Sequence, residues 1–352
     1  MSDILIMGAS YGALLAAKLL LAGHDVKLVC LPAEAELINA EGIRVRIPIR
    51  DRDELAEIDS RALAGTLTAD VPQAARPEGC DLVVLAMQEP QYRSPGVREL
   101  LEAVARSRIR CMSIMNMPPL PFLARLREID LAACRTCYTD ATVWDAFDPS
   151  TMTLCSPDPQ AFRPPGAPSN VLQVRLATNF KAARFASEAD TAFLRGLQRD
   201  IEAARLDADG GRIDVPVKLK VHESVYVPLA KWAMLIAGNY RCVQDDAIRS
   251  IKDAVHSDLD ATRGVYEWVV KVCVALGAAP GDMVPFEKYA SAALALGSPS
   301  SAARALFGGA PYIERVDRLV QAVAAQKGMR LAALDEIVAR VDARLATNRR
   351  SA

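Results

Sequence analysis

Residues 4–29 read ILIMGASYGALLAAKLLLAGHDVKLV, and this segment gives the clearest indication of the fold. An apolar run at 4–7 leads into a glycine-containing turn at 8–13 and then into a helical pattern over 14–22. Gly23 stands where a helix ends in a left-handed residue, and 24–30 return to a strand pattern. The stretch therefore predicts a strand, a tight turn, a helix and a second strand, which is one βαβ unit of a parallel sheet.

The turn between strand and helix has the form of a phosphate-binding loop. Matched to GxGxxG/A, it presents Gly8, Ser10 and Ala13, so a serine replaces the glycine that normally lets a phosphate approach the backbone. The Ser10 hydroxyl could donate to a phosphate, or Gly12 could supply the close approach. Turns of this kind also occur in doubly wound domains that bind another nucleotide or none, so both interpretations stay open.

Composition restricts the class of protein. The chain has 352 residues, of which 51% are hydrophobic and 24% charged, and its net charge is −1. This length allows two domains, and the charge gives no reason to expect binding to nucleic acid or to an anionic membrane. The apolar stretch 12–22 is too short to span a bilayer and follows no basic segment, so we expect neither signal peptide nor anchor and a cytoplasmic protein.

The eight cysteines are spread along the chain, mostly in apolar runs, as is typical of reduced, buried thiols. Cys134 and Cys137 form a CxxC in a strand-like segment, and the three histidines lie far from them in sequence. We therefore expect a structural role for this pair and no metal site.

The rest of the chain predicts an α/β domain followed by an all-α domain. The predicted strands are 43–50, a central one at 81–87, 109–115, a β-like region at 132–154, and 171–176; the predicted helices are 97–107 and 189–205. Residues 51–78 predict a connection with short elements, and the Pro- and Gly-rich stretch 156–169 predicts a surface loop. From about 220 to 345 the pattern is helical, with breaks at 277–281, 297–299 and 308–311. The fold class is a Rossmann-like doubly wound parallel sheet at 1–218, binding a dinucleotide, and a helical substrate or dimerisation domain at 219–352.

The second strand should end at the ribose of a bound dinucleotide. This tip reads Cys30, Leu31, Pro32, Ala33, with neither the acid that binds a 2′-hydroxyl nor the arginine that binds a 2′-phosphate. Glu34, Glu36 and Lys27 are lesser candidates. The preference between NAD and NADP is therefore not decided by this segment.

Several segments together resemble the ketopantoate reductase (2-dehydropantoate 2-reductase) family, whose helical domain is related to that of phosphogluconate dehydrogenases. They are the opening GASYGALLAAKLLLAGHDVKLV, then DLVVLAMQEPQ and SIMNMP, and in the second domain PLAKWAMLIAGNY, SPSS and PYIERV. They follow family order along nearly the whole chain. The resemblance implies NADP or NAD as cofactor, with contacts from Gly8, Ser10, Tyr11, Gly12, Leu31, Met87, Gln88 and Asn116.

The same resemblance assigns roles in the second domain. The family lysine that acts as general acid toward the substrate carbonyl matches Lys231, and a cation there would stabilise the charge that reduction builds on the acceptor atom. A substrate-binding asparagine matches Asn239, eight residues later and on the same helix face. A second family asparagine is replaced by Leu235. The substrate-binding serine matches Ser300, or Ser301 if the register slips by one.

The sequence also departs from the family. The family glutamate near the nicotinamide falls on Tyr312, and Glu314, two residues along, is the catalytic candidate to replace it, a question that the sequence leaves open. Gln88 stands in place of a lysine, Met117 replaces the glycine next to Asn116, and the arginine of the second strand tip is absent. We therefore expect the fold to carry over and the substrate to differ.

The histidines are weaker candidates. His24 and His256 are expected to be structural, whereas His222, nine residues before Lys231, could approach the crevice as an acid.

Together these features predict an NAD(P)H-dependent oxidoreductase that transfers hydride to a small oxo acid, or to a related ketone or imine, other than ketopantoate. The alternative is a nucleotide- or small-molecule-binding protein of the same fold that has lost hydride transfer. The expected partners are a small-molecule substrate and a second copy of the chain.

Overall fold

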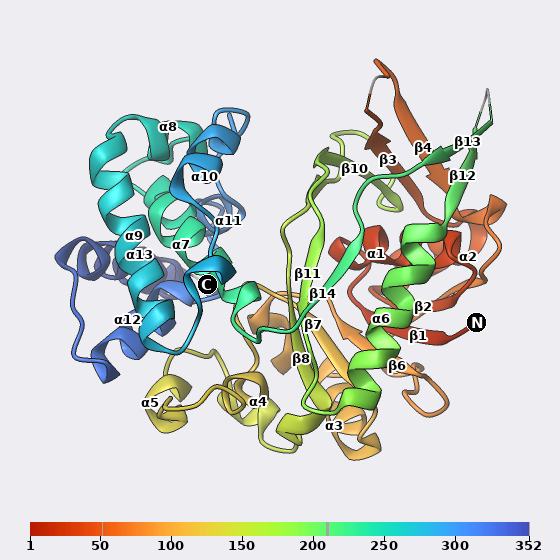
Figure 1. Cartoon of the computed structure of the whole chain (residues 1–352), viewed down its shortest axis with the longest axis horizontal. Helices are drawn as coiled ribbons and strands as arrows, with labels where there is room; N and C mark the ends of the chain where they lie inside the picture. Colours follow the sequence, from red (N-terminus) through yellow and green to blue (C-terminus); the bar gives the residue numbers. More distant parts are fainter. Residues whose placement is uncertain (51, 209–210, 352) are drawn as a thin grey trace. The chain divides into compact units, whose positions relative to one another are not determined.

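The computed structural model of the chain (Figure 1) describes residues 1–50, 52–208 and 211–351. Asp51, where the predicted connection begins, and Ala352, where the predicted second domain ends, lie outside the described residues. Contacts between residues group the chain into two compact units, each described here by itself. The sheet unit comprises Met1–Met87, Gln91–Arg125 and Thr142–Glu223, and the helical unit comprises Gln88–Pro90, Leu126–Ala141 and Ser224–Ala352.

The sheet unit is built on one long sheet. Its strands are β1 (Asp3–Met7), β2 (Asp25–Val29), β5 (Leu67–Asp70), β6 (Leu82–Leu85), β7 (Cys111–Ile114), β8 (Met152–Ser156), β11 (Phe180–Ala183) and β14 (Leu219–His222). They lie in the order β14-β11-β8-β7-β6-β1-β2-β5. Neighbours from β5 to β8 are parallel, β8 and β11 are antiparallel, and β11 and β14 are parallel. The predicted βαβ opening and the central position of β6 are confirmed.

Helices cover this sheet and bury both of its faces. They are α1 (Tyr11–Leu21), α2 (Pro32–Glu41), α3 (Val97–Ser107), α4 (Leu120–Leu123) and α6 (Glu188–Ala203). Ile4 and Ile6 on β1 join one apolar core with Leu14 of α1 and Leu194 of α6. Leu5, on the opposite side of the pleat, is buried as well. A parallel sheet buried on both faces is the doubly wound arrangement that the apolar strands predicted.

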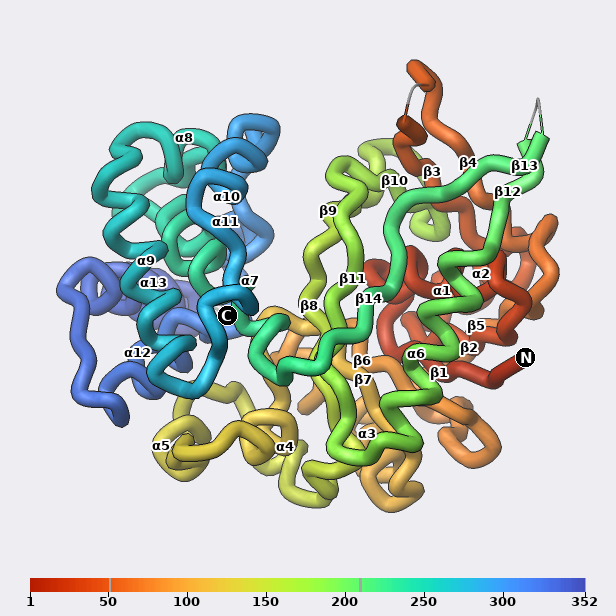
Figure 2. The backbone as a smooth tube through the Cα atoms, viewed as in Figure 1, coloured from red at the N-terminus to blue at the C-terminus, as the bar shows by residue number. Residues whose placement is uncertain are grey.

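A second sheet and a hairpin complete the sheet unit. The second sheet contains β3 (Arg44–Pro48), β4 (Leu55–Asp59), β9 (Gln160–Phe162) and β10 (Val171–Leu176), in the order β4-β3-β10-β9. Figure 2 follows the backbone from β8 out through β9 and β10 and back to the long sheet at β11. The hairpin pairs β12 (Arg205–Ala208) with β13 (Gly211–Asp214).

The first helix after residue 224 in the helical unit passes from α-helix to π-helix and then to a 3₁₀ turn. The segment α7 (Ala230–Met234) continues as a π-helix, η6 (Leu235–Asn239), and ends in a 3₁₀ turn, η7 (Tyr240–Cys242). The other helices are α5 (Leu131–Arg135), α8 (Ile251–His256), α9 (Leu259–Ala275), α10 (Phe286–Ala293), α11 (Ser301–Phe307), α12 (Val316–Gln326) and α13 (Ala332–Ser351). The breaks predicted at 277–281, 297–299 and 308–311 fall between these helices. Across both units, further short 3₁₀ turns are η1 (Ser60–Ala62), η2 (Glu89–Arg93), η3 (Ala141–Trp144), η4 (Pro149–Thr151), η5 (Val227–Leu229) and η8 (Pro280–Asp282).

Three sequence predictions are wrong. Residues 132–154 were expected to be β-like, but the strand β8 begins only at Met152, and α5, η3, η4 and turns precede it. Asp130 caps α5 and Asp148 caps η4 by accepting from the backbone N–H groups of Ala132 and Ser150. Strand β9 lies inside the predicted loop 156–169, where pairing with β10 holds it. Strand β14 occupies the beginning of the predicted helical region, because β11 offers it a parallel partner.

Candidate functional site

The phosphate loop requires a glycine at its first position. Gly8 has φ +111°, a conformation that L side chains rarely adopt. A Cβ placed there would lie 2.7 Å from the carbonyl oxygen of Ala86 and 2.7 Å from Cγ of Met87. The Gly8 N–H donates to the Val29 carbonyl at 2.9 Å, which ties the turn to β2. The turn is therefore as tight as the sequence predicted.

The N-terminus of α1 faces this turn with little side-chain cover. Ser10, the N-cap residue, is exposed and makes no capping hydrogen bond with its side chain. The backbone N–H groups of the first turn thus receive no hydrogen bond from the Ser10 side chain, and a helix N-terminus is a common binding position for an anion. Gly12 fits its helix against β1, since a Cβ there would lie 2.5 Å from Cγ2 of Ile6.

Tyr11 points from the same helix start toward the end of β8. Its hydroxyl donates to the Pro157 carbonyl at 3.0 Å, and its ring meets Phe180 edge-on, with centroids 6.2 Å apart. Burial, followed by the charge of Asp158, raises the pKa of the Tyr11 phenol, so it stays a hydrogen-bond donor. Asp158 in turn pairs with Lys181 at 2.9 Å.

The remaining cofactor candidates of the sheet unit follow neighbouring strands. In the order β7, β6, β1, β2, the carboxyl ends lead to Asn116, Met87, Gly8 and Leu31. Because these strands are parallel, their carboxyl ends share one edge of the sheet, where ligands of open α/β sheets bind. The fold therefore gathers at one edge candidates that lie 85 residues apart in sequence, from Leu31 to Asn116.

At the β2 tip the structure adds a group that sequence reasoning missed. Leu31 is 73% exposed, as expected of a residue between strand and helix. Glu34, in the first turn of α2, forms an ion pair with Arg163, which follows β9. The tip is thus not without charge. No pattern in the sequence could link these two residues, because they are 129 positions apart.

In the helical unit, Lys231 and Asn239 lie on one helix face. Along 230–240, a fully described stretch, only Lys231, Met234 and Asn239 are partly exposed and the other positions are buried. Two α-helical turns take about 7.2 residues. The π-helical turn from Leu235 to Asn239 closes i→i+5 instead of i→i+4 hydrogen bonds and so uses more residues per turn. The eight residues from Lys231 to Asn239 therefore come close to two whole turns.

Tyr289 and Gly238 maintain this π-helical turn. The Tyr289 hydroxyl donates to the Met234 carbonyl at 3.1 Å, and a Cβ on Gly238 would lie 1.9 Å from that hydroxyl oxygen. Only glycine leaves room for the phenol beside the helix. A side chain that satisfies a backbone carbonyl is a recognised cause of such a helix irregularity.

Contacts bring two further candidates, Ser300 and Glu314, to the end of the same helix. The Ser300 hydroxyl, which caps α11, donates to the Asn239 carbonyl at 2.7 Å. The Tyr240 hydroxyl donates to the Glu314 carbonyl at 2.5 Å and accepts from the Val316 N–H at 3.0 Å. The helix end is thus hydrogen-bonded both to the hydroxyl of Ser300, the candidate serine, and to the backbone of Glu314, the candidate carboxylate.

The Glu314 side chain adjoins the segment that carries Gln88. The Glu89 N–H donates to Oε1 of Glu314 at 3.3 Å. The buried Glu89 carboxylate accepts from the N–H and hydroxyl of Thr139, at 2.9 and 2.8 Å. Burial raises the pKa of the nearby Tyr138 phenol, and the charges of Glu89 and Glu314 add to this rise. Glu89 and Tyr138 are therefore parts of this cluster that sequence reasoning missed.

Tyr312 contacts the C-terminal helix α13 through Arg349. It is 36% exposed, and the Arg349 guanidinium lies 5.0 Å from the centroid of its ring. The backbone carbonyl of the neighbouring Pro311 accepts from Nε of Arg349 at 3.0 Å. Arg349 thus holds the segment before Glu314 against α13.

The three histidines and the CxxC cysteine Cys134 lie in or beside regular elements of the two units. His24 is buried beside Asp200 (3.3 Å), and Nε2 of His256 contacts the Ala290 carbonyl at 2.9 Å. His222 ends β14, a strand of the sheet unit. Cys134 lies in α5, not in a strand, and burial raises the pKa of its thiol. Among the described residues, no cluster of His, Cys, Asp and Glu side chains is placed to hold a metal ion.

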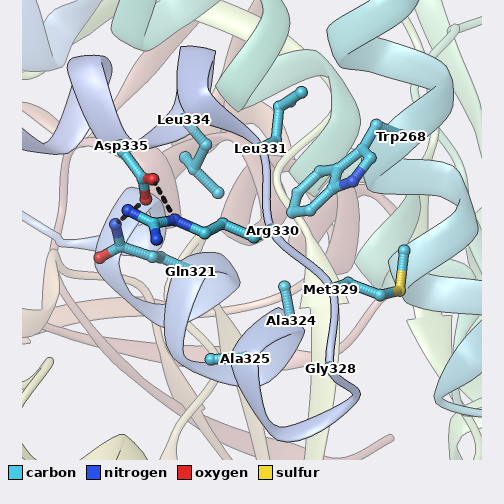
Figure 3. Close-up of a pocket in the computed structure, with 10 residues that line it drawn as sticks. All are labelled: Trp268, Gln321, Ala324, Ala325, Gly328, Met329, Arg330, Leu331, Leu334 and Asp335. Atoms are coloured by element: carbon cyan, nitrogen blue, oxygen red, sulfur yellow. Dashed lines mark hydrogen bonds and ion pairs between the residues drawn. The ribbon is translucent and has the colours of Figure 1, made fainter.

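A pocket of about 350 Å³ lies elsewhere in the helical unit (Figure 3). Its wall includes the Trp268 ring and Met329, and opposite them Asp335 accepts from Arg330 at 2.8 Å and from Gln321 at 2.7 Å. None of the predicted site residues lines it. Within the described part of the chain, no helix is long and apolar enough to cross a membrane.

No protein-family model and no curated protein matches the sequence. Solved structures do match. A 2-dehydropantoate 2-reductase from Methylococcus capsulatus superposes with a TM-score of 0.68 at 14% identity, covering 99% of this chain and 98% of that one. A ketopantoate reductase from Ralstonia eutropha gives 0.63 at 17% identity, and a D-mandelate dehydrogenase with NADH and anilino(oxo)acetate gives 0.64 at 12%, each covering 99% of both chains.

These likenesses establish the class of fold, a Rossmann-like sheet domain followed by a helical domain. The particular fold is that of the ketopantoate reductases, the family that the sequence motifs resemble. At identities this low the likeness is one of fold.

Proposed function

We propose that the chain is an NAD(P)H-dependent reductase of a small oxo acid, or of a related ketone or imine, other than ketopantoate. The observation that carries this proposal is the shared helix face of Lys231 and Asn239, the polar positions on a helix stretch whose other positions, Met234 excepted, are buried. We propose the predicted division of roles as well, with 1–218 binding the dinucleotide and 219–352 holding the substrate.

The residues of the sheet unit fit a dinucleotide. Gly8 has the positive φ of the tight turn, and the exposed N-terminus of α1 at Ser10 leaves backbone N–H groups for a pyrophosphate. Tyr11, Gly12, Leu31, Met87, Gln88 and Asn116 are proposed to line the rest of its site. When bound, the reduced nicotinamide supplies the electrons and hydrogen for the reduction.

The chain's own residues would supply the proton and the orientation. The Lys231 ammonium can donate to the substrate oxygen or nitrogen, where negative charge builds as the double bond is reduced. Asn239 and Ser300, joined by a 2.7 Å hydrogen bond from the serine hydroxyl to the backbone carbonyl of Asn239, would hold the substrate's polar groups. Glu314 would orient Lys231 or accept from the substrate, with Tyr312 at the border of the site.

The substrate should differ from ketopantoate because the charges around the site differ. Gln88 is an exposed neutral amide where the family has a lysine, and the adjoining groups Glu89 and Glu314 are carboxylates. A neutral amide gives up the charge-assisted part of a hydrogen bond to an anion, which makes charged pairs about twice as strong. The D-mandelate dehydrogenase structure, with its anilino(oxo)acetate, supports an oxo acid as the substrate class.

We also propose a homodimer, supported by the dimeric ketopantoate reductase of Staphylococcus aureus, which matches with a TM-score of 0.59 at 10% identity over 98% of this chain and 99% of that one. Sedimentation of the purified protein at several concentrations tests this.

Titration of the protein with NADPH and NADH, followed by nicotinamide fluorescence, tests the proposed function. We expect saturable binding of at least one cofactor and, in a screen of oxo acids and imines, oxidation of the reduced cofactor by some of them. Absence of saturable binding of both NADPH and NADH would overturn the proposed reductase activity. Binding without turnover on any compound of the screen would instead favour a nucleotide-binding protein that has lost hydride transfer.

A further inference from the structure

The first turn of α2, just after β2, carries an acid at about the sequence distance from the phosphate loop at which dinucleotide-binding folds use one. Glu34 lies in the first turn of α2, about 20 residues after the phosphate loop (Ala13 to Glu34). In such folds an acid at this distance binds the ribose 2′-hydroxyl of NAD, whereas an arginine nearby accommodates the 2′-phosphate of NADP. This chain has both groups at the same tip.

The arginine comes from the second sheet. Nη2 of Arg163, just after β9, contacts Oε1 of Glu34. The Glu34 side chain is 13% exposed and that of Arg163 is 38% exposed, so the guanidinium is the more accessible member. Burial raises the pKa of the Cys30 thiol at the tip to about 12, and Glu34 adds to this rise while Arg163 opposes it. Both charges therefore act at Cys30, the first residue after β2.

Lys27 of β2 and Asp70 of β5, charged residues of two neighbouring strands, are paired with each other. Lys27 lies 3.3 Å from Asp70, the last residue of β5, and the Cys30 N–H donates to the Asp70 carbonyl at 3.0 Å. Glu34 and Arg163 thus remain as the charged pair that α2 and the second sheet bring together at this edge.

We propose that Glu34 and Arg163 jointly set the preference between NADH and NADPH. Glu34 accepts hydrogen bonds from the ribose hydroxyls of NADH, and Arg163 binds the 2′-phosphate of NADPH, for which a guanidinium has matching geometry and charge. Each group is also the counter-ion of the other, so each weakens the preference that the other would impose. The inference rests on the dinucleotide site of the proposed function and explains a near balance between the two cofactors.

The test is to measure the Kd of NADH and of NADPH for the full-length protein and two variants by nicotinamide fluorescence. In Arg163→Ala we expect NADPH binding to weaken about tenfold or more, with NADH unchanged or tighter. In Glu34→Gln we expect the reverse, because Arg163 is released toward the 2′-phosphate. Both variants should fold, since partly exposed ion pairs contribute little to stability.

Glu41→Gln is the matched control. Glu41 ends the same helix and pairs with Arg44 at 3.1 Å, so it loses a comparable ion pair at the opposite end of α2. Its Kd values should equal those of the wild type. If the ratio of the two Kd values stays fixed in both test variants, or moves in the same direction in both, the pair is an ordinary surface contact and the inference is wrong. A wild-type protein that binds neither cofactor overturns the proposed function and this inference with it.

Discussion

The hydroxyl of Tyr289 donates to the carbonyl of Met234 at 3.1 Å, at the residue where α7 gives way to the π-helical turn η6. This contact is possible because Gly238 has no side chain. It links α10 to the helix that carries Lys231 and Asn239 and fixes the number of residues per turn between them. The alignment of the two candidate site residues therefore depends on a third residue that would contact neither substrate nor cofactor.

Gly238→Ala should lower both stability and turnover. The added Cβ would meet the Tyr289 hydroxyl, and overpacking of this kind costs about 1–3 kcal/mol of unfolding free energy. Tyr289→Phe should cost a similar amount, because it leaves the Met234 carbonyl without this donor. Urea unfolding of the two single variants and the double variant checks this. We expect the double variant to be less destabilised than the sum, because the clash and the hydroxyl disappear together.

Gly264→Ala is the control for this series. Gly264 lies within α9, and a Cβ there meets no atom within 4 Å. The substitution should therefore stabilise the protein by roughly 0.5–1 kcal/mol. Strictly additive effects of Gly238→Ala and Tyr289→Phe would contradict the role assigned to this contact.

Lys231→Ala should lower turnover by about two to four orders of magnitude, the range for loss of a positioned general acid. The Kd of the reduced cofactor should change little, because the proposed role is toward the substrate. Steady-state kinetics on an active oxo acid, together with the fluorescence titration, measure both. Lys271→Ala, which removes an exposed lysine from α9, is the control. Unchanged turnover in a folded Lys231→Ala protein would refute the assignment.

Lys18 should make stability depend on pH. Its buried ammonium donates to the carbonyls of Val215 and Pro216, at 3.0 and 3.1 Å, and burial together with the charge of Lys218 lowers its pKa to about 7. Above about pH 7 the unfolded chain, with an ordinary lysine pKa near 10.4, binds a proton that the folded chain has lost. The contribution of Lys18 to the free energy of unfolding therefore rises with pH above 7.

Urea unfolding at pH 6.5, 7.5 and 8.5 of wild type and Lys18→Met measures this effect. The comparison isolates Lys18 from the thiols, which begin to titrate near pH 8.5 in the unfolded chain. The difference between the two proteins should grow in favour of the wild type by about 1 kcal/mol or more over this interval. Parallel pH profiles would mean that Lys18 keeps its proton in the folded state.

Leu31→Arg should tighten NADPH selectively. Leu31 is 73% exposed at the N-cap of α2, so a guanidinium there adds a second donor group for a 2′-phosphate at the strand tip. We expect the Kd of NADPH to fall about tenfold and that of NADH to change little. In an Arg163→Ala background the same substitution should restore NADPH binding. A wild-type protein that already prefers NADPH a hundredfold would contradict the proposed near balance between the two cofactors at Glu34 and Arg163.

The sequence by itself determined the elements that local patterns encode. The helix predicted at 97–107 matches α3, and the βαβ opening matches β1, α1 and β2, because apolar periodicity, a turn glycine and a helix-ending glycine act within a few residues of each other. The candidate lysine and asparagine came instead from the resemblance of the segment around them to the ketopantoate reductases, and their roles stay predictions.

Strands and contacts that depend on residues far apart in sequence could be identified only from the tertiary structure. Strands β9 and β14 are short, and their extended conformation is stabilised by hydrogen bonds to β10 and β11 more than by their own side chains. The charge of the β2 tip depends on Arg163, which reaches Glu34 through the second sheet. The alignment of Lys231 with Asn239 depends on the Tyr289 hydroxyl, which lies 55 residues from its acceptor, Met234. A local pattern cannot encode a contact whose second partner is placed by folding, and the contacts of Arg163 with Glu34 and of Tyr289 with Met234 are both of that kind.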